Sequence, residues 1–154
     1  MWITTVALYS LCIAHALSNC PDGFLRHADT CYHFSHDTET YNSAKSICHN
    51  DLSGSTLVEI ETAEENAFLA AEAKRYNQYY IIALNDIAEE GVWVWGESHD
   101  KATYFNWGPG QPDNYNADEN CVQLAPNGEW IDIPCHQLKN YICELRDEGP
   151  EVVG

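Results

Sequence analysis

Seven cysteines in a chain of 154 residues constrain the fold more than any other feature of this sequence. The first, Cys12, lies in an apolar N-terminal stretch that ends in small residues at Ala14 and Ala16, a pattern typical of a secretory signal peptide. We expect cleavage after Ala16 or Ser18 and assign residues 1–18 to the signal peptide. An uncleaved membrane anchor is the alternative, but the apolar run is shorter than the ~20 residues that span a bilayer.

The remaining cysteines are even in number, which fits a secreted protein that folds in an oxidising compartment. They are Cys20, Cys31, Cys48, Cys121, Cys135 and Cys143. Their number alone leaves many connectivities open. By spacing, Cys20 and Cys31 can close a small N-terminal loop. Cys121 and Cys135 flank a hairpin, and Cys48 with Cys143 would then tie an early helix to the last strand.

The charge of the chain excludes several classes of partner. Seven Lys and Arg against 24 Asp and Glu give a formal net charge of −17, which disfavours nucleic acid and anionic membrane surfaces. A hydrophobic fraction of 45% is enough for a packed core, so the acidic residues belong on its surface. Carboxylates are hard oxygen ligands, and this excess makes Ca²⁺ the cofactor to consider.

The length fits one domain, which we place at residues 19–146, followed by a short acidic tail at residues 147–154. Thr62 and Glu65 form a capping-box signature that predicts a helix over residues 63–76. An earlier helix is expected near residues 41–49. The apolar positions of the later helix are Ala67, Phe68, Ala71 and Ala73.

Strands are expected on both sides of a long irregular segment. β-Branched and aromatic residues predict strands at residues 79–84 and 92–95. The dipeptide Asn127-Gly128 predicts a hairpin over residues 121–133, and a closing strand follows at residues 140–145.

The segment between these strands, residues 98–120, is rich in Gly, Pro, Asn and Asp. Its only large apolar anchors are expected to be Phe105 and Trp107. A loop of this length without secondary structure is uncommon and usually functional or disordered. Trp93, Trp95, Trp107 and Trp130 are expected to belong to the core.

Together these segments carry a resemblance to a known family. They are Cys20-Pro-Asp-Gly-Phe24, Cys31-Tyr32, the two expected helices, Ile81-Ile-Ala-Leu84, Trp93-Val-Trp95, Phe105-Asn-Trp-Gly-Pro-Gly-Gln-Pro-Asp-Asn114, Glu119-Asn-Cys121, Gly128-Glu-Trp-Ile-Asp132 and Tyr141-Ile-Cys143. From Cys20 to Leu145 the chain resembles a C-type lectin domain, and in particular the soluble secreted invertebrate lectins.

The resemblance implies an α+β C-type lectin fold, with two helices, small antiparallel sheets, a long calcium-binding loop and three disulfides. The implied pairs are Cys20–Cys31, Cys48–Cys143 and Cys121–Cys135, in agreement with the spacing.

The resemblance also implies a calcium site. Gln111 would supply a neutral carbonyl oxygen, and Asp113, Glu119 and Asp132 would supply carboxylates, which together suit the oxygen preference of Ca²⁺. In the family, the backbone carbonyl of Asp132 also contributes, and the Gln111–Pro112 bond is cis. Alone, the same residues would form only a polar turn.

The implied ligand of this site is a sugar of the galactose or N-acetylgalactosamine type. The side chains of Gln111, Asp113, Glu119 and Asp132 would hydrogen-bond the hydroxyls. An amide can donate whereas a carboxylate only accepts, so Gln-Pro-Asp reverses the donor order of a mannose-type Glu-Pro-Asn site. Tyr115 is a candidate to stack on the sugar ring. An ordinary exposed loop tyrosine is the alternative for Tyr115.

Ile131 departs from the family pattern, because sugar binders usually carry Asn there as a calcium ligand and hydrogen-bond donor. This departure and the acidic charge motivate an alternative function in which the same fold binds protein, mineral or ice. The leading hypothesis remains a secreted, calcium-dependent lectin for innate recognition or matrix. Its expected partners are glycans or glycoproteins, and homo-oligomerisation would add avidity.

A second, weaker calcium site is implied at Asp86, Glu90, Asn114 and Asn120, together with Glu119. Asn replaces the commoner carboxylates at two of these positions, and a solvated acidic loop is the alternative. No catalytic nucleophile or zinc motif occurs in the sequence, so an enzyme is not expected.

Overall fold

A computed structural model describes residues 20–52 and 54–146 of the chain. The expected signal peptide and acidic tail lie outside these residues. In chain order the elements are β1 (Leu25–His27), β2 (Thr30–Phe34), α1 (Tyr41–Asp51), β3 (Thr56–Leu57), α2 (Ala63–Tyr76), β4 (Tyr80–Asn85), β5 (Val94–Trp95), η1 (Tyr115–Ala117), β6 (Cys121–Leu124), β7 (Trp130–Ile133) and β8 (Asn140–Arg146).

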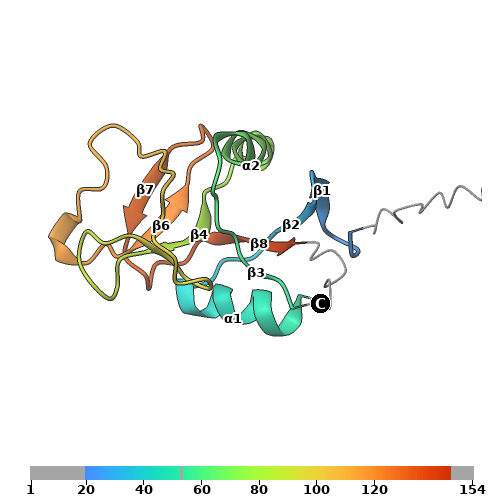
Figure 1. Ribbon diagram of the computed structural model, residues 1–154, viewed down its shortest axis with the longest axis horizontal. Coiled ribbons are helices and arrows are strands. Elements are labelled where there is room, and N and C mark those ends of the chain that lie inside the picture. Colours follow the sequence, from blue (N-terminus) through green and yellow to red (C-terminus); the bar gives the residue numbers. More distant parts are fainter. Residues whose placement is uncertain (1–19, 53, 147–154) are drawn as a thin grey trace, which may run out of the picture.

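The strands form two antiparallel groups that one parallel pairing joins. The path through the sheet is β1-β2-β8-β4-β6-β7, with β3 on β8 and β5 on β4. Tyr80 of β4 faces Asn140 of β8 in the parallel pair. The two helices lie on opposite sides of the strands in Figure 1, and the loop-rich end of the molecule extends away from β1. The α+β fold with two helices is confirmed, and the parallel contact is a feature that the sequence patterns did not indicate.

Both helices begin at side-chain caps. The Thr40 hydroxyl oxygen accepts the backbone N–H of Ser43 at 3.3 Å and starts α1. The Thr62 hydroxyl oxygen accepts the N–H of Glu65 at 3.2 Å, so α2 covers the predicted residues 63–76. In a standard capping box the Glu65 carboxylate would accept the N–H of Thr62. Here it accepts the N–H of the preceding residue, Glu61, at 3.0 Å. Neither helix in the described part of the chain has the length and apolarity to cross a membrane.

The buried face of α2 contains a polar residue. The helix buries Asn66, Leu69 and Ala73, whereas the apolar residues Ala67 and Ala71 are exposed. Asn66 is polar and still buried because its amide is hydrogen-bonded on both sides. Its Oδ1 accepts the indole N–H of Trp130 at 2.7 Å, and its Nδ2 donates to the Gly128 carbonyl at 3.0 Å.

The three expected disulfides are all present: Cys20–Cys31, Cys48–Cys143 and Cys121–Cys135. Cys48 and Cys143 are 95 residues apart and join α1 to β8. On the chain-entropy model, closing a loop of that length stabilises the fold by about 4–5 kcal/mol.

Trp130 is the centre of the aromatic core beneath the long loop. It is fully buried, and its ring centroid lies 5.5 Å from that of Tyr104 and 6.0 Å from that of Trp107. Trp95 is buried too, whereas Trp93 and Trp107 are only partly buried. Of the two expected loop anchors, Trp107 packs against the core, whereas Phe105 is 39% exposed and stacks on Trp107. Tyr104, which was not expected as an anchor, also packs against the core.

We expect Asn66→Leu to lower the free energy of unfolding by about 1–3 kcal/mol, because it leaves the Trp130 indole N–H buried without an acceptor. Urea denaturation measures this difference. Ala67→Ser, on the exposed neighbouring position, is the control and should change stability by less than about 0.5 kcal/mol. Equal effects of the two substitutions would show that the Asn66–Trp130 hydrogen bond does not stabilise the fold.

Candidate metal centre

The backbone of β7 holds the long loop in place. The Trp130 N–H donates to the Asn106 carbonyl at 2.8 Å, and the Gly108 N–H donates to the Trp130 carbonyl at 2.9 Å. The loop therefore continues the hydrogen bonding of the sheet before it turns outward at Gln111.

Asp132, two residues further along β7, fixes the next part of the loop with its side chain. It is 1% exposed. Its Oδ1 accepts the N–H of Asp113 at 3.2 Å, and its Oδ2 accepts the N–H of Asn114 at 2.7 Å. A buried carboxylate is stabilised by such N–H donors. These bonds place the Asp113 side chain beside Asp132.

Glu119 reaches the same region from the other side of the short helix η1. Its Oε2 accepts the N–H of Tyr115 at 2.9 Å, and its own N–H donates to the Asn114 side-chain carbonyl at 3.1 Å. Asn114 itself has a left-handed backbone with φ of 42°, a conformation that asparagine tolerates better than most residues. Asn114 thus positions Glu119, a role that was not predicted from the sequence.

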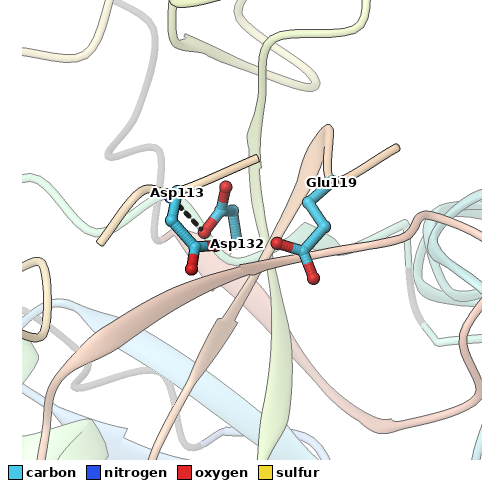
Figure 2. A group of neighbouring side chains, drawn as sticks. All are labelled: Asp113, Glu119 and Asp132. Carbon is cyan, nitrogen blue, oxygen red and sulfur yellow. Dashed lines mark hydrogen bonds between the residues drawn. The ribbon is translucent and has the colours of Figure 1, made fainter. Parts of the chain in front are cut away.

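Three of the predicted ligands converge. One carboxylate oxygen from each of Asp113, Glu119 and Asp132 lies within 4.8 Å of the others. Figure 2 shows Asp113 and Asp132 side by side and Glu119 facing them. Burial raises the pKa of Glu119, and the nearby carboxylates of Asp113 and Asp132 raise it further. Like charges at this separation repel one another unless a cation lies between them.

Gln111, the fourth predicted ligand, carries a buried side-chain oxygen that lacks a hydrogen-bond partner among the described residues. Its bond to Pro112 is cis, as the resemblance implied. Gln111 is two residues before Asp113 of the carboxylate cluster. A buried oxygen without a partner at this position fits a ligand of a hard divalent cation. The donor set is thus of the right chemical type for Ca²⁺.

Tyr115 and Ile131 flank this centre in different environments. Tyr115 begins η1 and is 67% exposed, so its ring is available to a ligand. Ile131 lies on β7 between Trp130 and Asp132, and its side chain packs against the hydrophobic core. Ile131 therefore contributes hydrocarbon packing and no polar group.

The second predicted set is centred on Asp86, whose Oδ1 is buried and lacks a hydrogen-bond partner among the described residues. Asp86 is 2% exposed, and its Oδ2 accepts the N–H of Gly91 at 2.8 Å. Burial and the charges of Glu90 and Asp132 raise its pKa. Glu90 is exposed, and Asn120 contacts Asp86 through its backbone carbonyl. Among the described residues, the carboxylate cluster contains neither Asp86 nor Glu90.

Comparison with known proteins places this chain in a family. The family described as "Lectin C-type domain" matches residues 37–145. The chain is 33% identical over 133 residues to human asialoglycoprotein receptor 2, with 82% of this chain and 41% of the receptor covered. It is 34% identical over 131 residues to a perlucin-like protein of Mytilus galloprovincialis, with 81% and 82% covered. The chain thus spans about two fifths of the receptor's length.

The fold is also similar to that of a solved structure. The carbohydrate-recognition domain of the mouse scavenger receptor C-type lectin superposes with a TM-score of 0.75 at 32% identity. The match covers 83% of this chain and 98% of that domain.

Without divalent cations, we expect Asp113→Asn to raise the free energy of unfolding by a few tenths to about 1 kcal/mol, because it removes one of three repelling charges at an exposed position. Denaturation in chelator measures the effect. Asp22→Asn, an exposed aspartate far from the cluster in sequence, is the control and should be neutral. A loss of stability in chelator would contradict the proposed repulsion.

Proposed function

This chain belongs to the C-type lectin family, and on that basis we propose that it is a secreted, calcium-dependent lectin that binds glycans ending in galactose or N-acetylgalactosamine. The observation that carries the proposal is the convergence of Asp113, Glu119 and Asp132 within 4.8 Å. We propose binding without catalysis, because the site offers ligands for a cation and hydrogen-bond partners for hydroxyls.

The chemistry of the site suits a sugar. Calcium, when bound, would supply positive charge and coordination positions for two adjacent sugar hydroxyls. Asp113, Glu119 and Asp132 would hold the ion and accept hydrogen bonds from those hydroxyls. Gln111 can both donate and accept through its amide.

The order of these groups supports the choice of sugar. Gln111 places an amide donor where a mannose-type site has a carboxylate, and Asp113 places an acceptor where such a site has an amide. The exposed Tyr115 ring could cover the apolar face of a galactose ring. These features together favour galactose-type over mannose-type ligands.

The disulfides support the proposed extracellular compartment. Three disulfides in a small domain are typical of proteins that fold in oxidising compartments. This supports secretion and contact with extracellular glycans or glycoproteins. Because single sugar sites are weak, homo-oligomerisation would strengthen binding to multivalent glycans.

Ile131 favours a second candidate function, in which the fold binds protein, mineral or ice rather than sugar. Its side chain packs against the core and offers neither an oxygen to calcium nor a donor to a hydroxyl. The acidic surface, with a net charge of −17, would suit calcium-containing mineral. A sugar-binding measurement separates the two candidates.

Calcium at a hundredfold excess over its Kd should stabilise the fold by about 2.7 kcal/mol, because it binds only the native state. Glu119→Gln should weaken calcium binding by at least about tenfold, whereas Asp86→Asn should weaken it by less than about threefold. Urea denaturation with and without calcium measures the stabilisation, and calorimetric titration of calcium measures the two affinities. Equal losses in the two variants would mean that the Asp86 region is the main site.

Ile131→Asn should raise affinity for galactose by about ten- to a hundredfold, because it adds a hydrogen-bond donor at a charged site. Ile131→Leu is the control and should give no gain. Calorimetry at saturating calcium measures both. The double variant Gln111→Glu with Asp113→Asn should shift preference toward mannose.

The second candidate function predicts that no monosaccharide binds in the same experiment. If wild type and variants bind calcium but neither galactose nor mannose, the lectin proposal is wrong. Retention of the wild-type protein on calcium carbonate, or inhibition of ice growth, would then support the alternative.

A further inference from the structure

A polar groove follows one side of α1 and is separate from the carboxylate cluster. It consists of three adjoining cavities of about 280, 350 and 260 Å³. Asn42 lines all three, and Lys45 lines two of them. The three cavities therefore share the first turns of α1 as a common wall, and we refer to them together as the α1 groove.

One face of α1 provides a wall of the groove. Its residues follow helical spacing, because positions three and four apart share a face. They are Asn42, Lys45, Ser46, His49 and Asn50. From Asn42 to Asn50 this wall is about 12 Å long at 1.5 Å per residue, which is longer than a single sugar ring.

The groove is close to neutral although the chain is strongly acidic. Its charged side chains are Lys45, Glu97 and Asp118. Lys45 pairs with Glu97 at 3.5 Å, and Asp118 lies 3.9 Å from His136. The other lining side chains offer amides, hydroxyls, imidazoles and a few apolar groups.

Two further hollows of the described chain show the contrast. One is lined by Glu61, Glu64 and Glu65, and the other by Glu59, Glu97 and Glu144, with Arg146 in both. Those surfaces would select cations or basic groups. The amides and hydroxyls along α1 would suit a neutral ligand with many hydroxyls.

The floor of the groove is held by internal hydrogen bonds. Lys45 Nζ donates to the Gly96 carbonyl at 2.7 Å. The Tyr41 hydroxyl donates to the Ala83 carbonyl at 2.8 Å and accepts from Asn85 Nδ2 at 3.0 Å. By contrast, the Asn42 side chain is exposed and makes no hydrogen bond to another described residue. A fixed floor with an uncommitted amide at its centre is suited to a ligand, because little order must be imposed on binding.

One end of the groove is connected to the candidate metal centre through the chain itself. Asp118 and Asn120 line the first cavity and flank Glu119 in the chain. We propose that the groove along α1 is an extended subsite for an oligosaccharide whose terminal sugar is held at the carboxylate cluster. This inference rests on the proposed lectin function and specifies its ligand as an oligosaccharide rather than a single sugar.

Calorimetry at saturating calcium tests the subsite, with galactose and a set of galactose-terminated tri- and tetrasaccharides of different linkage as probes. At least one oligosaccharide should bind about tenfold more tightly than galactose. Asn42→Trp, which fills the junction of the cavities, should reduce that oligosaccharide to the affinity of galactose and leave galactose binding unchanged. Asn42→Ala should cost about three- to tenfold, as for one lost hydrogen bond. Gln78→Trp, an exposed position outside the groove, is the control and should change neither affinity.

The outcomes separate the subsite from the lectin function. If galactose binds but no oligosaccharide binds more than about threefold better, the subsite is wrong and the lectin function stands. If no sugar binds, both proposals are wrong. If Asn42→Trp weakens binding to a whole glycoprotein but not to its released glycans, the groove contacts protein and the oligosaccharide assignment is overturned.

Discussion

The contact between β7 and the long loop is the interaction on which the proposed site depends. β7 bonds to the loop through the backbone of Trp130 and then through the side chain of Asp132, which accepts two loop N–H groups. The loop otherwise has only short elements of its own. A single strand thus fixes both the packing of the loop and the position of Asp113, and the same Asp132 supplies one of the clustered carboxylates.

The rest of the fold keeps β7 in place. Asn66 of α2 accepts the buried Trp130 N–H, and this hydrogen bond links the helix to the hairpin. The Cys121–Cys135 disulfide joins the start of β6 to the chain just after β7. This rigid support is what allows three carboxylates to be held together, since their repulsion would otherwise separate them. A bound cation would remove that repulsion and turn a locally destabilised region into a stable one.

Local signals in the sequence predicted much of this architecture. The capping box at Thr62 gave the bounds of α2, and Asn127-Gly128 gave the hairpin. The burial of Asn66 in α2 was not predicted, because it depends on Trp130, which lies 64 residues away. Resemblance to a family supplied the convergence of Asp113, Glu119 and Asp132, which spacing alone does not give. The role of Asn114 depends on its left-handed backbone, and the α1 groove depends on tertiary packing against the loop around Gly96.

The proposed function rests on two separate groups of polar side chains. The carboxylates at the loop would bind a cation, and the neutral amides along α1 would bind hydroxyls. The most direct test of the central claim is a crystal structure grown with calcium, with the ion located by anomalous scattering. We predict one peak about 2.3–2.6 Å from oxygens of Asp113, Glu119 and Asp132, with Gln111 Oε1 among the ligands. A peak bound only by Asp86 and Glu90, or no peak at the three carboxylates in saturating calcium, would contradict it.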